Sequence, residues 1–169
     1  MQVTLARISR IVSTGMLSAA AVTTMAAQSV TTTISENPGS SSRTTTVTGA
    51  AGKTATYQNN AAWGNGSYTD TRSATGFNGK TASSTTSASY TPGSTSRQTT
   101  VTGFNGRSAT YDNNRSWGSG TYSDNKSYRG FDGATRSDTV SRSHGLVTNT
   151  FTGRNGNSRT VARFARYRR

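Results

Sequence analysis

The sequence predicts an all-β fold in which 27-residue strand-turn-strand repeats form an antiparallel meander. Three observations predict it. Glycines recur at a regular spacing, Asn-Gly or Asp-Gly pairs follow most of them, and Thr, Ser, Tyr and Val fill the intervening segments. Asn-Gly and Asp-Gly are strong hairpin signals, whereas Thr, Tyr and Val favour strands. No segment after residue 40 has the 3.6-residue apolar period of a helix.

The repeat is visible in several aligned columns. Gly49, Gly76, Gly103 and Gly130 follow one another at a constant 27-residue interval, and Gly153 comes after a shorter one. An aromatic column lies fourteen positions after the glycine and contains Trp63, Tyr90, Trp117 and, at its last position, His144. Alternate units resemble each other most, so there is also a longer, 54-residue period. A fixed period of this kind is typical of repeat architectures.

Each unit has two turn signals. The pairs that follow the repeat glycines predict two-residue type I′ turns, which need positive φ at both central residues. These structural turns are Asn78, Gly79, Asn105, Gly106, Asp132, Gly133, Asn155 and Gly156. Half a unit later come WGNG, TPG, WGSG or HG. Two turns in each unit leave strands of roughly 8–11 residues, within the usual range of strand lengths.

A β-solenoid is the alternative architecture, because the aligned aromatic column also suits stacked coils. Polar and apolar residues alternate along the expected strands with little contrast, as in residues 54–57 and 108–111. Such strands specify register poorly, so the turns and the aromatic column must set much of it. Either architecture leaves open edges on which another chain can pair.

Residues 1–27 have the layout of a signal peptide and are expected to form its helix. Arg7 and Arg10 precede a short apolar stretch, and Ala26 and Ala27 supply small residues for cleavage. The expected location is therefore secreted, periplasmic or at the cell surface. Mitochondrial import is the alternative, since no acid precedes Glu36.

Three further segments follow the leader. We expect a Ser/Thr-rich linker over residues 28–43, the 27-residue β-repeats over 44–152, and a partial repeat with an Arg-rich tail over 153–169.

The composition argues against an enzyme. The chain has no cysteine and one histidine, and its six acids form no cluster with metal-ligand spacing. It contains neither the GxSxG motif of hydrolases nor a phosphate-binding loop. We therefore expect no catalytic residue, no metal, no cofactor and no small-molecule substrate.

The charge balance is strongly basic, with 19 Lys and Arg against six acids and a net charge of +13. One interpretation is a self-repelling surface that keeps a β-rich chain soluble. The other is a polyanion partner such as DNA, lipopolysaccharide or acidic polysaccharide, because Arg neutralises phosphate and aromatics stack on bases. The candidate contacts are Arg154, Arg159, Arg163, Arg166, Arg168 and Arg169.

The order of segments, a leader followed by Gly/Asn/Ser/Thr-rich strand-turn-strand units with a regular aromatic, resembles curlin-type secreted bacterial fibre subunits. The resemblance covers residues 44–160. It implies a secreted β-rich protein that associates with copies of itself.

These observations predict an exported structural or interaction protein of the cell surface or extracellular matrix, which self-assembles through its β-edges. A polyanion-binding module is the alternative. A third possibility is a flat Thr-rich surface that binds ice or glycan, suggested by segments such as residues 43–48.

Overall fold

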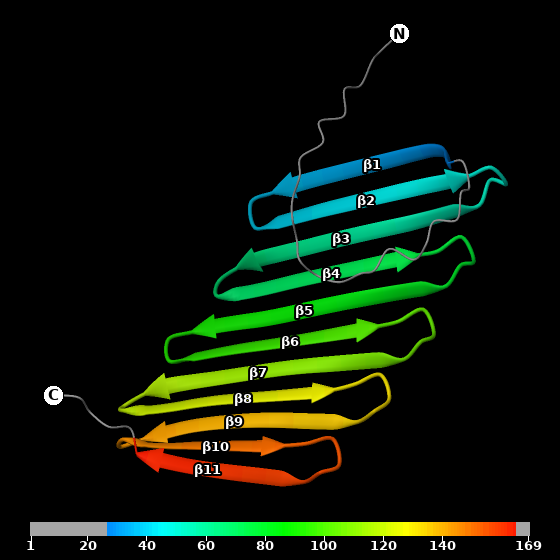
Figure 1. Ribbon diagram of the computed structural model, residues 1–169. Helices are drawn as coiled ribbons and strands as arrows, with labels where there is room; N and C mark the ends of the chain where they lie inside the picture. The colour runs from blue at the N-terminus through cyan, green and yellow to red at the C-terminus, as the bar shows by residue number, and fades with distance from the viewer. Residues whose placement is uncertain (1–26, 165–169) are drawn as a thin grey trace.

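The computed structural model describes residues 27–164, and all of their regular structure is β. Eleven antiparallel strands form one open sheet in which the spatial order of the strands is their order in the sequence (Figure 1). The predicted all-β meander is confirmed. The solenoid alternative is wrong, because each strand pairs with its neighbour across a hairpin and not with the equivalent strand of the next unit. Of the expected signal-peptide helix over residues 1–27, all but Ala27 lies outside the described residues, and Ala27 begins a strand.

The strands are of similar length except at the C-terminal end. They are β1 (Ala27–Asn37), β2 (Ser40–Gly49), β3 (Thr54–Gly64), β4 (Ser67–Thr75), β5 (Thr81–Thr91), β6 (Ser94–Thr102), β7 (Ser108–Gly118), β8 (Thr121–Arg129), β9 (Thr135–Ser143), β10 (Leu146–Thr152) and β11 (Ser158–Phe164).

The segment expected to be a linker, residues 28–43, instead forms most of β1 and the first part of β2. Residues 37–49, which include the end of this segment, closely match residues 91–103 in the next 54-residue repeat. In both places a Pro-Gly pair closes a hairpin and is followed by Ser and then by Arg at the fourth position after the glycine. The longer period therefore extends one hairpin further towards the N-terminus than the glycine spacing indicated.

One end of the sheet consists of two-residue turns of two kinds, which alternate over the first four hairpins. Asn65-Gly66, Ser119-Gly120 and His144-Gly145 have positive φ at both residues, as a type I′ turn requires. Pro38-Gly39 and Pro92-Gly93 have positive φ only at glycine, because the proline ring holds its own φ negative. That is the pattern of a type II turn. This difference in backbone geometry underlies the 54-residue period.

At the opposite end, the expected type I′ geometry at the Asn-Gly and Asp-Gly pairs is wrong. In the β4–β5 loop, the N–H of Gly79 donates to the Gly76 carbonyl (2.9 Å), the N–H of Gly76 donates to the Lys80 carbonyl (2.9 Å), and only Gly79 has positive φ. This is a three-residue loop with one left-handed glycine. The Asn78 side chain accepts the N–H of Lys80 (3.0 Å), and Asn105, Asp132 and Asn155 do the same in their loops.

The pairing register displaces successive repeat units along the strand direction. Trp63 lies opposite Tyr68, and Tyr68 lies opposite Ala88, so the row of Trp63 meets β5 at Ala88. The residue equivalent to Trp63 in the 27-residue repeat is Tyr90, two positions beyond Ala88. Equivalent residues of successive units are therefore displaced by two positions, which is why the strands in Figure 1 step steadily towards one side.

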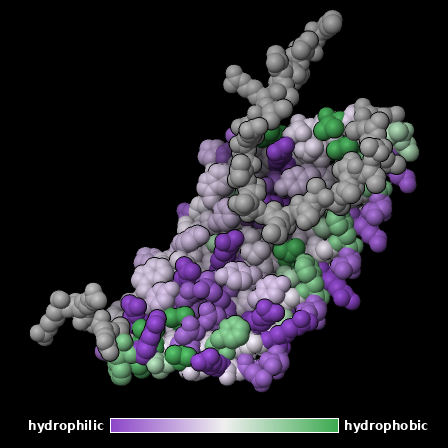
Figure 2. Space-filling view, in the orientation of Figure 1, coloured by the Kyte–Doolittle hydropathy of each residue, from purple (hydrophilic) through white to green (hydrophobic). Residues whose placement is uncertain are grey.

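The sheet is a single layer, and no second layer is built from residues 27–164. Ala88 and Ala109, each 7% exposed, are the buried hydrophobic residues of this region. In Figure 2, hydrophilic and hydrophobic residues are interspersed across the visible face. Backbone pairing and side-chain contacts along the surface, in place of an enclosed core, hold the described strands together.

Candidate interaction surfaces: two faces and two edges

The two faces of the sheet differ sharply in chemistry. Successive side chains of a strand point to opposite faces, and residues opposed across two strands share a face. Following the register from strand to strand places every Tyr and Trp of the described strands on one side, which we call the aromatic face. Its members are Tyr57, Trp63, Tyr68, Tyr90, Tyr111, Trp117, Tyr122 and Tyr128.

The other side, which we call the hydroxyl face, consists mainly of Ser and Thr. On β4 its residues are Ser67, Thr69, Thr71, Ser73 and Thr75, and on β5 they are Thr81, Ser83, Thr85, Ser87, Ser89 and Thr91. Many of the hydroxyls contact one another across strands. Examples are Ser89 with Ser96 (2.8 Å between Oγ atoms), Thr102 with Ser108 (2.8 Å) and Thr152 with Ser158 (2.7 Å).

Charge is also segregated between the faces. The aromatic face carries nine of the strand Lys and Arg residues, namely Arg43, Arg72, Arg97, Arg115, Lys126, Arg136, Arg142, Arg159 and Arg163. On the described strands the hydroxyl face carries one cation, Arg129, and one acid, Asp112. Asp112 accepts hydrogen bonds from Gln98 (2.8 Å) and Ser127 (3.3 Å). The aromatic face is therefore the cationic face.

Two buried acids form ion pairs with cations of the aromatic face. Asp124 is 6% exposed, and its Oδ2 lies 3.3 Å from Arg115 Nε and 3.2 Å from Lys126 Nζ. Asp70 holds the equivalent position in the preceding 54-residue repeat, is 8% exposed, and pairs with Arg72 (2.7 Å). The hydrogen bond from Arg72 to Asp70 raises the pKa of Arg72 above its ordinary value, against the opposing effect of burial. These equivalent positions suit a repeated structural role.

Aromatic side chains meet across strands at positions that the sequence columns did not identify. Trp63 lies opposite Tyr68, Trp117 opposite Tyr122, and Tyr111 opposite Tyr128. Cross-strand aromatic pairs contribute to sheet stability and register. The 54-residue spacing of Tyr68 and Tyr122 was a signal that could have predicted two of these pairs.

The predicted aromatic column has a backbone role as well. The N–H of Trp63 donates to the Gly39 carbonyl (2.8 Å), that of Tyr90 to Gly66 (2.6 Å) and that of Trp117 to Gly93 (2.8 Å). Each bond ties the turn of one hairpin to the end of the next odd-numbered strand.

His144, the fourth member of the column, occupies a different place. It is the first residue of the β9–β10 turn, with φ of +46°, and its Nδ1 lies 2.8 Å from Ser143 Oγ. The structure thus brings Trp63, Tyr90 and Trp117 to equivalent strand ends and separates His144 from them.

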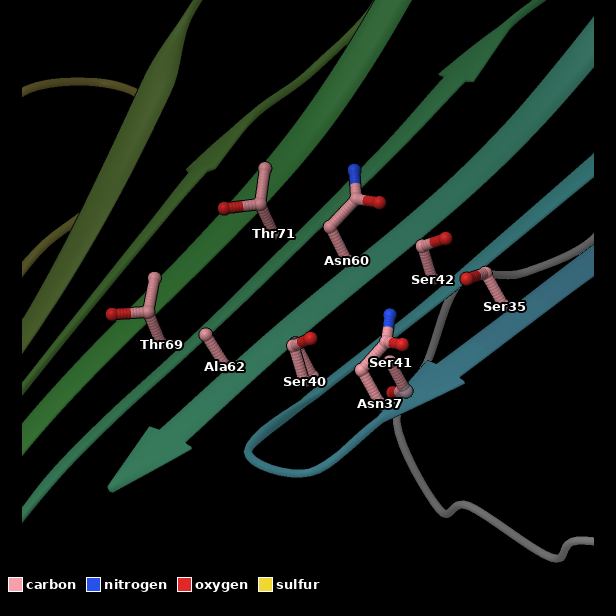
Figure 3. Close-up of a pocket in the computed structure, with 10 residues that line it drawn as sticks. Ser35, Asn37, Ser40, Ser41, Ser42, Asn60, Ala62, Thr69 and Thr71 are labelled. Atoms are coloured by element: carbon pink, nitrogen blue, oxygen red, sulfur yellow. The ribbon is translucent and has the colours of Figure 1, made fainter.

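Two shallow hollows lie on opposite faces. Figure 3 shows the one on the hydroxyl face, about 310 Å³, where Ser, Asn and Thr side chains of β1–β4 surround the small Ala62. On the aromatic face, a hollow of about 270 Å³ is lined by Tyr90, Arg97, Tyr111 and Arg115, among others. The first offers uncharged hydrogen-bonding groups, and the second offers guanidinium groups beside aromatic rings.

Of the six predicted polyanion contacts, the three that the structure describes lie in two different places. Arg159 and Arg163 are exposed on the aromatic face of β11, whereas Arg154 lies in the β10–β11 loop and pairs with Asp132. Arg166, Arg168 and Arg169 lie outside the described residues. The hydrogen bond from the Ala134 N–H, with the nearby Arg154 guanidinium, lowers the pKa of Asp132 below its ordinary value.

The two edges of the sheet are unlike. β1 has eleven residues, and its Val30 and Ile34 are each 61% exposed. β11 has seven residues, among them Arg159 and Arg163. Within residues 27–164, no strand pairs with the outer side of either one.

Over the same residues, no group of three or more His, Cys, Asp and Glu side chains is placed to hold a metal ion. The described part of the chain also contains no helix with the length and hydropathy needed to cross a membrane. Comparisons with protein-family models, curated proteins and solved structures give no match to this chain.

Proposed function

We propose that the protein is an exported structural or interaction repeat protein of the cell surface or extracellular matrix, without enzymatic activity, that self-associates through its β-edges. The observation that carries the proposal is the single-layer sheet whose two outer strands have unpaired outer edges within the described residues. Unpaired N–H and C=O groups along an edge are a template for another strand.

The absence of an enclosed core from residues 27–164 supports the same function. Ordering a residue costs about 1–2 kcal/mol of backbone entropy, which enclosed apolar surface normally offsets. Here Trp63, Tyr90 and Trp117 remain 46–56% exposed. Pairing at an edge leaves these central rings exposed, but it would cover part of Val30 and Ile34, each 61% exposed on β1, and would satisfy the backbone groups of that edge. The sheet therefore gains stability by joining copies of itself. The resemblance to curlin-type subunits agrees with that behaviour.

Sedimentation velocity and circular dichroism over a wide concentration range test self-association. We expect a β-type spectrum and an average mass that rises with concentration. A chain that stays monomeric and random-coil throughout contradicts the proposal. Export is tested separately by adding protease to intact cells, which should degrade a surface-bound chain and spare a cytoplasmic control protein.

A second candidate function, polyanion binding, is favoured by the hollow on the aromatic face. There, Arg97 and Arg115 lie beside Tyr90 and Tyr111. Guanidinium groups neutralise phosphates, and tyrosine rings stack on bases or sugars, so this surface suits a single-stranded nucleic acid or an acidic glycan.

The two faces provide the matched control for polyanion binding. The double variant Arg97→Gln with Arg115→Gln should weaken binding of a single-stranded DNA oligonucleotide. It should also make the slope of log affinity against log salt concentration shallower, by the amount expected for the loss of about two phosphate contacts. Arg129→Gln removes one strand arginine from the hydroxyl face and should change the slope less than Arg97→Gln or Arg115→Gln does alone. Affinity that is insensitive to salt, or equal losses in both variants, contradicts an electrostatic site on the aromatic face. Lipopolysaccharide in place of DNA distinguishes the class of polyanion.

A further inference from the structure

The central segment of the edge strand β1, from Ser29 to Ser35, lacks the features that usually prevent strand addition. From Ser29 to Ser35 it contains neither a charge nor a proline, and all of these residues are exposed. Natural sheets protect such edges with Lys, Arg, Pro or short strands. β11 is protected in this way, because it is four residues shorter than β1 and carries Arg159 and Arg163. The edge available for pairing is therefore that of β1.

The same seven residues are chemically palindromic. They read Ser, Val, Thr, Thr, Thr, Ile, Ser, with Thr32 at the centre. When two copies of a strand pair antiparallel about a two-fold axis at Thr32, Val30 of each copy lies opposite Ile34 of the other. The outer serines, Ser29 and Ser35, are likewise opposed. A symmetric contact of this kind is self-complementary, as a two-fold dimer requires.

The faces of the sheet favour this register over its neighbours. Val30, Thr32 and Ile34 lie on the aromatic face, as their β2 partners Val47, Thr45 and Arg43 do. A one-residue slip opposes residues of different faces. A two-residue slip places Val30 opposite Glu36, or Ile34 opposite the irregular pairing between Ala27 and Ser29. The register centred on Thr32 keeps opposed residues on the same face and pairs each apolar residue with another apolar residue.

We propose that β1 pairs antiparallel with β1 of a second copy of this chain, about a two-fold axis at Thr32, to make one continuous sheet. This inference rests on the proposed self-association and names its edge and its register. The resulting dimer has β11 at both outer edges. Because β11 is short and carries arginine, the dimer is the unit that forms first, ahead of any longer assembly.

Single cysteines in the full chain test the register, since the protein has no cysteine of its own. Opposed residues have Cβ atoms about 4.5–5.5 Å apart, close to the span of a disulfide, whereas diagonal neighbours are about 7–8 Å apart. Thr32→Cys should therefore give a reducible dimer under mild oxidation. Thr31→Cys places its cysteine opposite Thr33 and should give little covalent dimer on a non-reducing gel, although the strands still pair. The double variant Thr31→Cys with Thr33→Cys should restore cross-linking.

Lysine variants test the edge independently of disulfide geometry. Thr32→Lys puts a charge on the β1 edge and should abolish the dimer in sedimentation. Thr45→Lys is the matched control. In the native chain, Thr45 Oγ1 on β2 lies 3.1 Å from Thr32 Oγ1, so Thr45→Lys loses the same contact as Thr32→Lys but leaves the β1 edge unchanged. Circular dichroism verifies that both variants fold.

Two results would overturn the inference. One is equal cross-linking of Thr31→Cys and Thr32→Cys, and the other is no cross-linking of Thr32→Cys at concentrations where the native chain associates. Either result leaves self-association through another surface intact, including the case in which residues before β1 cover this edge. A native chain that is monomeric at every concentration overturns the inference and the proposed function together.

Discussion

The aromatic face and the hydroxyl face share one backbone but differ in how much of the fold they specify. On the aromatic face, residues meet particular partners, such as Trp63 with Tyr68 and Asp124 with Arg115. On the hydroxyl face, Ser or Thr meets Ser or Thr at most positions, as along β4 and β5. A two-residue slip would therefore exchange equivalent pairs on the hydroxyl face and destroy specific pairs on the aromatic face. The comparison indicates that one face and the turns set the register.

The largest expected loss of stability is at the turn that contains Gly66, because this glycine lies against the backbone of the neighbouring strand β5. Gly66 has φ of +71°, and a Cβ added there would lie 2.4 Å from the carbonyl oxygen of Tyr90. Gly66→Ala combines left-handed strain with this clash and should lower the free energy of unfolding by about 2–4 kcal/mol in urea titrations.

Gly120 is the matched control for the turn, because it occupies the equivalent position in the next 54-residue repeat. It has φ of +75°, and no atom lies within 4 Å of an added Cβ. Gly120→Ala should cost only the backbone strain, about 1 kcal/mol. Equal losses in the two variants, measured at one fixed protein concentration, would show that the Gly66–Tyr90 approach does not matter for register.

A smaller effect is expected from cutting an aromatic pair. Tyr111→Ala removes the cross-strand contact with Tyr128 and should cost about 1–2 kcal/mol, from lost aromatic contact and lost burial. Its neighbour Thr110 points to the hydroxyl face, so Thr110→Ala should change the free energy of unfolding by about 0.5 kcal/mol or less. If Thr110→Ala lowered the free energy of unfolding more than Tyr111→Ala, the hydroxyl face would contribute more to stability than the aromatic face, which contradicts this prediction.

The acids of the two faces give a third comparison. Asp124→Ala leaves Arg115 and Lys126 without their shared partner and should cost about 1 kcal/mol, because solvent screens the partly exposed cations. Asp112→Ala on the hydroxyl face removes hydrogen bonds to two neutral groups and should cost about 0.5 kcal/mol. Thermal unfolding at low and high salt separates them, since only the Asp124 contribution should shrink with salt.

The smallest expected effect concerns Asp132, which lies in a loop and belongs to neither face. Its lowered pKa means that its contribution to stability is present above the unfolded-state pKa and is lost as pH falls through the folded-state pKa. Asp132→Asn keeps a side-chain acceptor for the Ala134 N–H, as Asn78, Asn105 and Asn155 do in their loops. Neutral-pH stability should change little.

The acid limb of the unfolding curve measures this prediction. It should become shallower in Asp132→Asn, because one group that binds a proton on acid unfolding is gone. Asn105→Asp, which introduces an acid at the equivalent loop position, should steepen the same limb. An unchanged limb in both variants contradicts a role for this carboxylate in pH dependence.

Much of the fold could be predicted because it depends on local chemistry. The Asn-Gly and Asp-Gly pairs marked the loops correctly, but their backbone type was wrong. The side-chain oxygen of residues such as Asn78 accepts an N–H two residues later, which favours a three-residue loop over a type I′ turn. The type I′ turns occur instead at Asn65-Gly66, Ser119-Gly120 and His144-Gly145, within the WGNG, WGSG and HG segments.

The two-faced character of the sheet was the main feature that sequence reasoning missed. When alternation is measured as apolar against polar, the aromatic face, with its Arg, Asn and Asp residues, has little contrast with Ser and Thr. The alternation is between positions that are mostly Ser or Thr and positions of mixed type, which include aromatic and charged residues together with some Thr, such as Thr95 and Thr99. The gathering of repeat arginines such as Arg97 and Arg115 on the aromatic face was missed, because these residues are dispersed in sequence and come together only through pairing.

The sequence by itself determined the repeating unit, its main turn positions and the all-β class, because turn chemistry and strand propensity act over a few residues. The choice of the meander over the solenoid came from the strand pairing. Only the tertiary structure decided the two-residue displacement between successive hairpins, the separation of the aromatic and hydroxyl faces, and the exposure of the uncharged residues 29–35 at the β1 edge. These depend on which residues oppose one another across strands. That pairing is set jointly by turn geometry and by partners distant in the sequence, such as Gly66 and Tyr90.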